Sequence, residues 1–276
     1  IGARRVCRRQ PLPSVSACMS EILDIEAMHR LDGKVCVVTG ASSGFGDRFA
    51  RVLSAAGGNV VVAARRQDRL EKLVSELPDA LAIQCDVSDD DQCRQLISET
   101  VSHYGQIDVL VNNAGITDAV HAAEEAKIEV FRNVIDVNLN ACFLLSALAA
   151  QDMLTRRQGS IINVASVHGL VASAPNLQPA YAASKAALVN LTRDLAVQWA
   201  KRGIRVNALC PGYFDTELTH GMFEDERSTN WIERNASMGR GGSPEELDGA
   251  LLFLASNASS YVTGIPLPVD GGWIAR

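Results

Sequence analysis

Residues 34–46 read KVCVVTGASSGFG, and this stretch decides the fold. The apolar, β-branched run over residues 34–39 predicts a buried strand, and helical spacing predicts a helix over residues 44–57. Glycines between a strand and a helix permit a tight turn and let backbone N–H groups approach a phosphate at the helix N-terminus. The residues expected to form this phosphate cradle are Gly40, Ser42, Ser43, Gly44, Phe45 and Gly46.

The rest of the chain continues the same alternation of strands and helices. Five further short apolar runs predict strands at residues 59–64, 80–85, 107–112, 160–165 and 204–209. Longer helical stretches separate them, among them residues 124–156 and 180–201. Near-continuous apolar strands between helices indicate a parallel sheet covered on both faces. We therefore expect an α/β, doubly wound (Rossmann-type) single domain over residues 31–276, with its ligand beyond the carboxyl ends of the strands.

The first thirty residues differ from this pattern. Residues 1–19 carry four arginines, two prolines and no acidic side chain. We expect a flexible extension outside the fold, and an organellar leader, an appended segment or translated upstream sequence remain open, since Met19 and Met28 could both be starts. No apolar stretch near it is long enough for a secretory or membrane segment.

Composition narrows the class of protein. Hydrophobic residues make up 47% of the 276 residues and charged residues 21%, as in soluble globular enzymes. The net charge of −6 argues against nucleic acid or an anionic membrane as the main partner. The seven cysteines form no CxxC pair, which predicts no metal site and no disulfide framework, and Cys36, Cys85 and Cys210 fall in or beside strand-like runs as core residues. A reducing, cytoplasmic location is expected.

Four further motifs follow the glycine loop in a fixed order. Residues 112–115 read NNAG after the fourth strand, residues 181–185 read YAASK, residues 211–212 read PG, and residues 269–272 read VDGG. Together with the Gly-x-x-x-Gly-x-Gly spacing, this set resembles the short-chain dehydrogenase/reductase family in its single-domain branch, over about residues 31–273. The resemblance implies hydride transfer between a nicotinamide cofactor and the carbonyl or hydroxyl carbon of a small molecule. The alternatives are a 3-oxoacyl-thioester reductase, a sugar or polyol dehydrogenase, and a non-catalytic nucleotide-binding sensor.

Tyr181 is the candidate general acid/base. A phenol titrates near pH 10, so it needs help to exchange protons near neutrality. Lys185 projects from the same helix face four residues on, and its ammonium, with the positive ring of the oxidised cofactor, should lower the tyrosine pKa. By resemblance, Lys185 also holds the nicotinamide ribose, Ser166 hydrogen-bonds the substrate oxygen, and Asn138 anchors a water that relays protons.

The end of the second strand predicts which cofactor is preferred. An acidic residue there would bond the ribose hydroxyls of NAD. Here Ala64 takes that place and Arg65 and Arg66 follow it, so we expect a preference for NADP(H), with Arg65 on the 2′-phosphate. Arg66 could instead simply begin the next helix. Ser43 stands where some NADP-specific relatives carry a basic residue, so NAD(H) is not excluded.

Other cofactor contacts come from the resemblance. Asp86 resembles the family's adenine-contacting aspartate, beside Val87, although it could equally cap the helix that begins near Ser88. The end of the fourth strand should approach the cofactor, and the turn after the sixth strand should carry the chain past the nicotinamide, with a threonine on the carboxamide. These residues are Asn113, Ala114, Gly115, Pro211, Gly212 and Thr216.

The substrate side is expected in two variable segments. Residues 168–179 make the spacing from Ser166 to Tyr181 about two residues longer than the family leads us to expect, and His168 should form the pocket wall, with acid/base work as the alternative. By resemblance, residues 213–240 should form a mobile lid over the substrate, although the aromatic side chains there could equally be packing residues. Thr192 is expected to be a packing residue. Apolar helices over residues 141–145 and 182–199 could by themselves be ordinary core, but the resemblance implies that they pair across dimer axes, and we expect a homotetramer.

Overall fold

The computed structural model describes residues 24–276 except residues 121, 174, 176 and 218. Residues 1–23, which contain most of the predicted extension, its arginines and Met19, lie outside this range. A short helix, α1 (Ile25–His29), opens the described part, and Asp24 caps it by accepting a hydrogen bond from the Ala27 N–H at 2.9 Å. Leu31 is only 2% exposed and is the first residue to enter the core.

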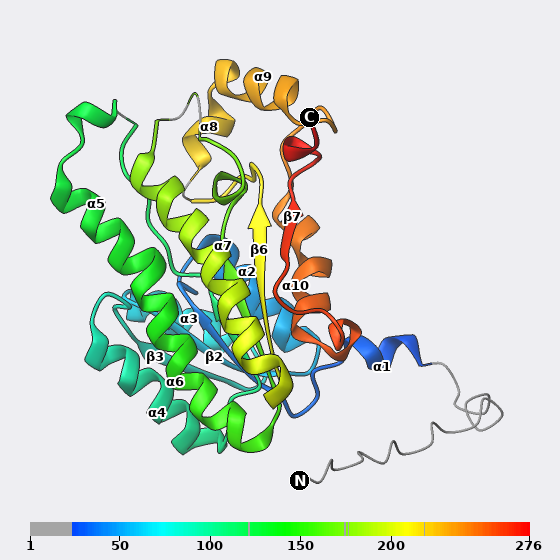
Figure 1. The fold of residues 1–276 in the computed structure, drawn as a ribbon. Coiled ribbons are helices and arrows are strands. Elements are labelled where there is room, and N and C mark those ends of the chain that lie inside the picture. Colours follow the sequence, from blue (N-terminus) through cyan, green and yellow to red (C-terminus); the bar gives the residue numbers. More distant parts are fainter. Residues whose placement is uncertain (1–23, 121, 174, 176, 218) are drawn as a thin grey trace, which may run out of the picture.

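The described strands form one parallel sheet, as the sequence predicted (Figure 1). In chain order they are β1 (Val35–Thr39), β2 (Asn59–Ala64), β3 (Ala80–Gln84), β4 (Val109–Asn112), β5 (Gly159–Val164), β6 (Ile204–Pro211) and β7 (Pro266–Val269). Their spatial order is β3-β2-β1-β4-β5-β6-β7. The chain therefore winds outward from β1 in one direction and from β4 in the other. A crevice at such a switch point, beyond the carboxyl ends of the strands, is where doubly wound sheets bind ligands.

Alternate residues of each strand enter opposite cores. Cys36 and Val38 of β1 face the core covered by α2 (Gly44–Ala55), α3 (Gln67–Ser75) and α10 (Asp248–Ala255). Val35 and Val37 face the core covered by α4 (Asp90–Tyr104), α6 (Ala141–Arg156) and α7 (Pro179–Trp199). Because side chains alternate along a strand, burial on both sides requires the continuous apolar runs seen in the sequence.

The helical stretch predicted from residue 124 starts later and is not uniform. A separate 3₁₀ turn (Ala123–Glu125) comes first, then α5 (Ile128–Ile135), a π-helical turn (Asp136–Asn140) and α6. Residues 128–156 are the one helical stretch of the described chain long and apolar enough to cross a membrane, with a mean hydropathy of 1.4 over an 18-residue window. Core helices have the same composition, and α6 packs against α4, β4 and β5.

The strand β7 was not predicted, because its sequence, Pro-Leu-Pro-Val, contains two prolines. Proline has no N–H to donate and is confined to sheet edges. β7 occupies such an edge and pairs only with β6, where Pro266 lies opposite Ala208 and Pro268 opposite Cys210. Its position beside β6 brings the VDGG segment to the carboxyl end of the sheet.

Two short helices lie over the carboxyl end of β6. They are α8 (His220–Glu224) and α9 (Glu226–Asn235), within the segment predicted to be the lid (Figure 1). Asp225 caps α9 by accepting a hydrogen bond from the Ser228 N–H at 2.8 Å. Ile232 is buried beneath α9, so this helix is anchored to the fold by at least one core side chain.

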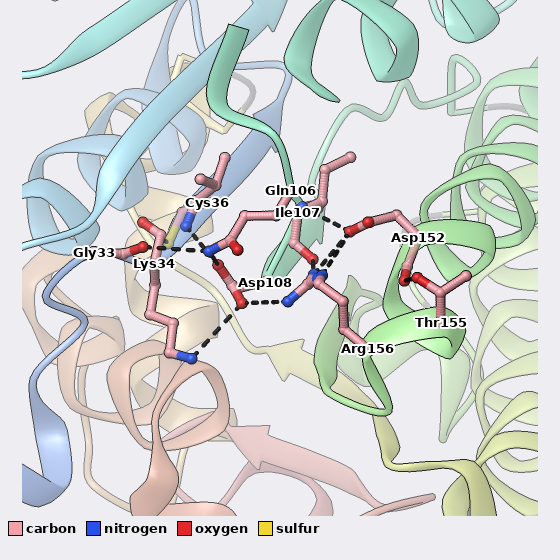
Figure 2. Close-up of polar contacts among 10 residues, drawn as sticks. Gly33, Lys34, Cys36, Gln106, Ile107, Asp108, Asp152, Thr155 and Arg156 are labelled. Atoms are coloured by element: carbon pink, nitrogen blue, oxygen red, sulfur yellow. Dashed lines mark hydrogen bonds and ion pairs between the residues drawn. The ribbon is translucent and has the colours of Figure 1, made fainter. Parts of the chain in front are cut away.

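A polar network closes the amino end of the sheet, on the side opposite the predicted ligand crevice (Figure 2). The Asp108 carboxylate accepts hydrogen bonds from the Val35 N–H at 2.9 Å, from Gln106 at 2.7 Å and from Arg156 at 3.0 Å. The Lys34 ammonium lies 3.6 Å away. Through these bonds the Asp108 carboxylate joins the beginnings of β1 and β4 to the end of α6. Only 3% of its side chain is exposed, so the network is buried at its centre.

The cysteines that the structure describes are buried free thiols: Cys36, Cys85, Cys93, Cys142 and Cys210. Cys7 and Cys18 lie outside the described residues. Among the described side chains, no group of three His, Cys, Asp or Glu residues could hold a metal ion.

Candidate active site

A cavity of about 570 Å³ lies at the carboxyl ends of the central strands, and most of the predicted site residues line it. They are Gly40, Ser42, Ser43, Gly44, Phe45, Arg65, Arg66, Asp86, Val87, Asn113, Ala114, Gly115, Ser166, Tyr181, Lys185, Pro211, Gly212 and Thr216. Three predicted residues do not line it: Gly46, Asn138 and His168. The structure thus brings together residues that are up to 176 positions apart, from Gly40 to Thr216.

The glycine loop requires glycine where its backbone lies too close to a neighbouring backbone segment to leave room for a Cβ atom. A Cβ at Gly40 would lie 2.8 Å from the Ala114 Cα, and Gly40 also has a φ of +67°. A Cβ at Gly46 would overlap the Gly40 carbonyl oxygen. Thr39 ties the loop to the neighbouring strand, because its Oγ1 accepts hydrogen bonds from the N–H groups of Asn113 (3.0 Å) and Ala114 (3.1 Å). The loop and the NNAG segment therefore form one narrow floor that leaves room for a backbone-bound phosphate.

Arg66 does more than begin α3. Its guanidinium donates to Ser42 Oγ at 3.1 Å and to Ser43 Oγ at 2.7 Å, and it also pairs with Glu217. A positive charge therefore does stand at the glycine loop, although the loop itself carries Ser43. The Arg65 side chain is exposed and lines the same cavity.

Asp86 does not cap α4. Its Oδ1 accepts hydrogen bonds from the Ser88 N–H (3.0 Å) and the Ser88 hydroxyl (2.7 Å), which closes a local turn. Asp89 is the cap, and it accepts from the N–H groups of Asp91 and Gln92. Of the two alternatives that the sequence left open, the helix-cap interpretation is therefore wrong, and Asp86 lines the cavity with Val87.

Tyr181, Ser166 and Lys185 converge at one end of the cavity. Burial raises the pKa of Tyr181, and a hydrogen bond from Ser166 opposes that rise. The Lys185 Nζ lies 5.6 Å from the centre of the Tyr181 ring and donates to the Val164 carbonyl at 2.7 Å, while burial lowers its pKa. Burial therefore outweighs the other influences on the Tyr181 pKa, and the Lys185 ammonium faces the ring and a carbonyl rather than the phenol oxygen.

Asn138 lies behind the cavity wall in the π-helical turn. It is fully buried, its Oδ1 accepts from the Ile116 N–H, and its Nδ2 donates to the Ile116 carbonyl, each at 2.9 Å. It also donates to Ser184 Oγ at 3.0 Å. A Cβ on Gly115 would lie 3.3 Å from Asn138 Oδ1 and 3.4 Å from Lys185 Nζ. Glycine at position 115 therefore keeps the corner between the asparagine and the lysine open.

His168 is placed differently from the expectation that it forms the pocket wall. It is 8% exposed, and its Nε2 lies 3.1 Å from the Tyr213 hydroxyl. Burial lowers its pKa, and its ring stands edge-on to that of Tyr181, with 6.1 Å between centroids. The tight turn Val167–Gly169 directs the imidazole behind the two tyrosines. Tyr213 in turn contacts Trp231 and Trp273, so His168 connects Tyr181 to an aromatic cluster of these three residues.

A second residue missed in the sequence is Asp118. Its carboxylate, 3% exposed, accepts hydrogen bonds from the N–H groups of Ala180 (3.1 Å) and Tyr181 (3.0 Å). Asp118 therefore caps α7 from a segment more than sixty residues away in the chain. Sequence reasoning looks for a cap immediately before a helix, where Gln178 stands without a side-chain capping bond.

Behind the site, a buried polar network joins the central strands to the helices. Asn112 Nδ2 donates to Asn163 Oδ1 at 2.9 Å, and Asn163 Nδ2 donates to Thr192 Oγ1 at 2.9 Å. Thr192 is fully buried, which confirms its assignment as a packing residue. These bonds satisfy polar groups that would otherwise be costly inside the core.

We expect Asp118→Ala to lower both stability and turnover. The loss of a helix cap should cost about 1–2 kcal/mol of unfolding free energy. Turnover should fall roughly tenfold, because the first turn of α7 positions Tyr181 and small displacements of a catalytic group are expensive. Denaturant unfolding and steady-state kcat would measure the two effects. Asp118→Asn keeps one acceptor oxygen but turns an amide NH2 toward the other N–H, so it should recover only part of both losses. An alanine variant that loses stability but keeps full kcat would contradict the positioning role.

Comparison with known proteins agrees with this geometry. A family model described as enoyl-(acyl carrier protein) reductase matches residues 40–274. Galactitol 2-dehydrogenase (L-tagatose-forming) of Cereibacter sphaeroides is 40% identical over 254 residues, which cover 91% of this chain and 99% of that protein. The 3-oxoacyl-[acyl-carrier-protein] reductase FabG of Thermotoga maritima is 41% identical over 250 residues, with 89% and 99% covered.

Solved structures give the same result. A short-chain type dehydrogenase/reductase from Mycobacterium marinum superposes with a TM-score of 0.87 at 38% identity, covering 92% of this chain and all of that one. A gluconate 5-dehydrogenase from Burkholderia cenocepacia J2315, solved with NADP and tartrate, also superposes with a TM-score of 0.87, at 35% identity and with the same coverage.

A doubly wound sheet with a glycine loop after β1 and a tyrosine–lysine pair at the same crevice defines a dinucleotide-dependent oxidoreductase. The chain belongs to the short-chain dehydrogenase/reductase family, whose members act on CH–OH groups with NAD(P).

Proposed function

We propose that this enzyme is an NADP(H)-preferring reductase of small carbonyl compounds, or dehydrogenase of the matching secondary alcohols. The observation that carries the proposal is the convergence of Ser166, Tyr181 and Lys185 at the end of a cavity whose other end is lined by the glycine loop and two arginines. When bound, the nicotinamide supplies or accepts the hydride. The protein's own part is to orient the substrate oxygen and to move one proton.

Tyr181 is proposed as the group that moves this proton. In reduction its hydroxyl donates to the carbonyl oxygen, and in oxidation its oxygen accepts from the alcohol. Ser166, hydrogen-bonded to Tyr181, holds the same substrate oxygen. Burial raises the pKa of Tyr181. The positive charge of a bound oxidised cofactor would lower it again and favour tyrosinate.

Lys185 and Asn138 are proposed to connect Tyr181 to the cofactor ribose and to solvent. The Lys185 ammonium has donors left after its bond to Val164, and the open corner at Gly115 lies beside it. The Asn138 side chain is bonded to Ile116 and Ser184, so it holds that wall. Its backbone carbonyl accepts from the Cys142 thiol at 3.3 Å and is proposed to use its second lone pair to anchor a water.

The remaining cavity residues are proposed to hold the cofactor. The loop residues from Gly40 to Gly46 take the pyrophosphate on their backbone N–H groups, and Asp86 with Val87 takes the adenine. The segment at Asn113 to Gly115 borders the ribose. Pro211, Gly212 and Thr216 border the nicotinamide; Gly212 suits this turn because a Cβ there would lie 2.7 Å from the Asp270 Cα.

For the cofactor preference, we expect Arg65→Ala to weaken NADP(H) selectively. Its exposed guanidinium can form charge-assisted hydrogen bonds to a 2′-phosphate but has no counterpart on NAD(H). NADP⁺ affinity should fall about tenfold, with NAD⁺ affinity unchanged. Isothermal titration with both cofactors would measure this, and Arg202→Ala, at the amino end of β6, is the matched control. An unchanged ratio of the two affinities would contradict the assignment of Arg65.

The substrate class is tested by turnover against a panel. Ketones, 3-oxoacyl thioesters and sugars or polyols would be assayed with NADPH and NADH in parallel, or with the oxidised cofactors for the alcohols. The thioester and polyol alternatives enter through relatives named for 3-oxoacyl-[acyl-carrier-protein] and for galactitol. Residues 213–240 are proposed as the lid over this substrate, and the contact between Tyr213 and Trp231 ties its helix α9 to the end of β6. The longer loop at residues 168–179 is proposed to shape the mouth; Ala174 and Asn176 lie outside the described residues.

We further propose a homotetrameric, cytoplasmic enzyme. Apolar side chains are exposed along the helices expected to pair, with Phe143 of α6 at 51% and Val197 of α7 at 80%. Burying such side chains between identical copies is the usual solution for a symmetric oligomer. Light scattering coupled to gel filtration should give four times the chain mass, and a mass of 29.6 kDa in solution would contradict this.

A further inference from the structure

Glu217 is a carboxylate that the proposed mechanism does not use. It follows Thr216 in the segment between β6 and α8, and its side chain reaches the arginines at the end of β2 and in α3. Oε1 accepts from Arg66 Nη1 at 3.0 Å and Oε2 from Arg66 Nη2 at 3.1 Å. Arg69 Nη1 donates to the same carboxylate at 3.2 Å. The arrangement is a two-pronged arginine–carboxylate pair reinforced by a second arginine.

The cluster of arginine and serine side chains around Glu217 is part of the cofactor cavity. Arg66 also donates to the hydroxyls of Ser42 and Ser43 in the glycine loop, and Ser43 in turn hydrogen-bonds Glu217. Glu217, Arg66 and both serines line the cavity together. Two guanidinium groups and the Ser43 hydroxyl around one anion, next to the end of β2, form the kind of site that a phosphate monoester also fits.

The bound carboxylate is charged and exchangeable. Hydrogen bonding to Arg66, then to Ser43, lowers the pKa of Glu217 to about 2. The side chains of Glu217, Arg66 and Arg69 are 49%, 40% and 46% exposed, so water and a competing anion can reach the pair. A phosphate dianion offers more charge and more acceptor oxygens than a carboxylate, whereas a ribose 2′-hydroxyl offers no charge and cannot displace it.

We propose that Glu217 is an internal occupant of the site that receives the 2′-phosphate of NADP(H), and that it thereby sets how strongly the enzyme discriminates NADP(H) from NAD(H). This inference rests on the proposed preference for NADP(H), and it adds Arg66, which Glu217 contacts, to Arg65 as a second ligand of the 2′-phosphate. NADP(H) has to displace the carboxylate, while NAD(H) binds with the carboxylate in place. Since Glu217 lies three residues before α8, its displacement also releases one tether at the start of the lid segment.

The test is Glu217→Gln, which keeps the size of the side chain and removes its charge. Isothermal titration would give the dissociation constants of NADP⁺ and NAD⁺, and of the fragments 2′,5′-ADP and 5′-ADP, which isolate the 2′-phosphate. Because exposed ion pairs are weak, we expect NADP⁺ and 2′,5′-ADP to bind about two- to fivefold more tightly, with NAD⁺ and 5′-ADP unchanged. Glu233→Gln on α9 makes the same charge change away from the arginines and should alter none of the four constants.

Three results would overturn the proposal. Equal tightening of NADP⁺ and NAD⁺ would indicate a general electrostatic effect. Weaker NADP⁺ binding would mean that Glu217 holds the arginines in place for the phosphate. No change in any constant would mean that the phosphate and the carboxylate do not share a site. The proposed preference for NADP(H) is tested separately on the wild-type enzyme, and it fails if NAD⁺ binds as tightly as NADP⁺. The role of Glu217 is measured instead by how Glu217→Gln changes the ratio of the two dissociation constants. The melting temperature of each variant checks that the fold is intact.

Discussion

Replacing Tyr181 with phenylalanine is expected to lower kcat by roughly 10²–10⁴-fold, the contribution typical of a positioned general acid or base. The substitution removes only the hydroxyl, which is the one group at this end of the cavity that both hydrogen-bonds Ser166 and can exchange a proton with a substrate oxygen. The phenyl ring keeps its edge-on contact with His168 and its place near Lys185. Cofactor affinity should therefore change little. Steady-state assays would measure kcat, and a binding titration with NADP⁺ would measure the affinity separately.

The matched control is Tyr104→Phe. Tyr104 ends α4 and donates its hydroxyl to Asp79 at 3.0 Å, with no contact to the cavity residues. Its loss should leave kcat within a factor of two. If Tyr181→Phe kept more than a tenth of the wild-type kcat with unaltered cofactor binding, another group would have to transfer the proton, and His168 would be the first to examine.

The second large effect is expected at the opposite end of the sheet, where Asp108→Ala should lower the free energy of unfolding by about 2–4 kcal/mol. The buried carboxylate accepts hydrogen bonds from the Val35 N–H, Gln106 and Arg156, and the Lys34 ammonium forms an ion pair with it at 3.6 Å (Figure 2). Alanine would remove the acceptor of the Val35 N–H and the counter-ion of Lys34, while Arg156 would keep its ion pair with Asp152 at 2.8 Å. The value is below that of a fully enclosed pair because Lys34 and Arg156 are 29% and 25% exposed and can be partly hydrated. Urea unfolding followed by circular dichroism would measure it.

Asp91→Ala provides the comparison for this second prediction. Asp91 pairs with Arg94 at 4.0 Å, but its side chain is 97% exposed, so its loss should cost less than about 0.5 kcal/mol. Activity per folded molecule should survive Asp108→Ala, because the network lies at the amino end of the sheet. An unfolding free energy equal to that of Asp91→Ala would show that the network contributes no net stability.

The cofactor floor and the catalytic pair could be predicted because local rules generate them. Gly40 to Gly46 follow a strand and open a helix, and Tyr181 and Lys185 lie four residues apart on one helix. In both cases, the spacing along the chain determines the spacing in space. Arg65 and Arg66 were found in the same way, by their position directly after β2, although the contact of Arg66 with the serines depends on how the loop turns back toward it.

By itself the sequence determined the alternation of apolar strands and helices, and hence the parallel sheet with its ligand side at the carboxyl ends. Tertiary structure alone decided which distant residues complete the site. Asp118 caps a helix that begins at Pro179, Glu217 enters the arginine cluster from the far side of the cavity, and β7 pairs at an edge despite its prolines. Local propensities act over a few residues, whereas these contacts join segments tens to more than a hundred residues apart, so their partners exist only once the sheet has brought the ends of its strands together.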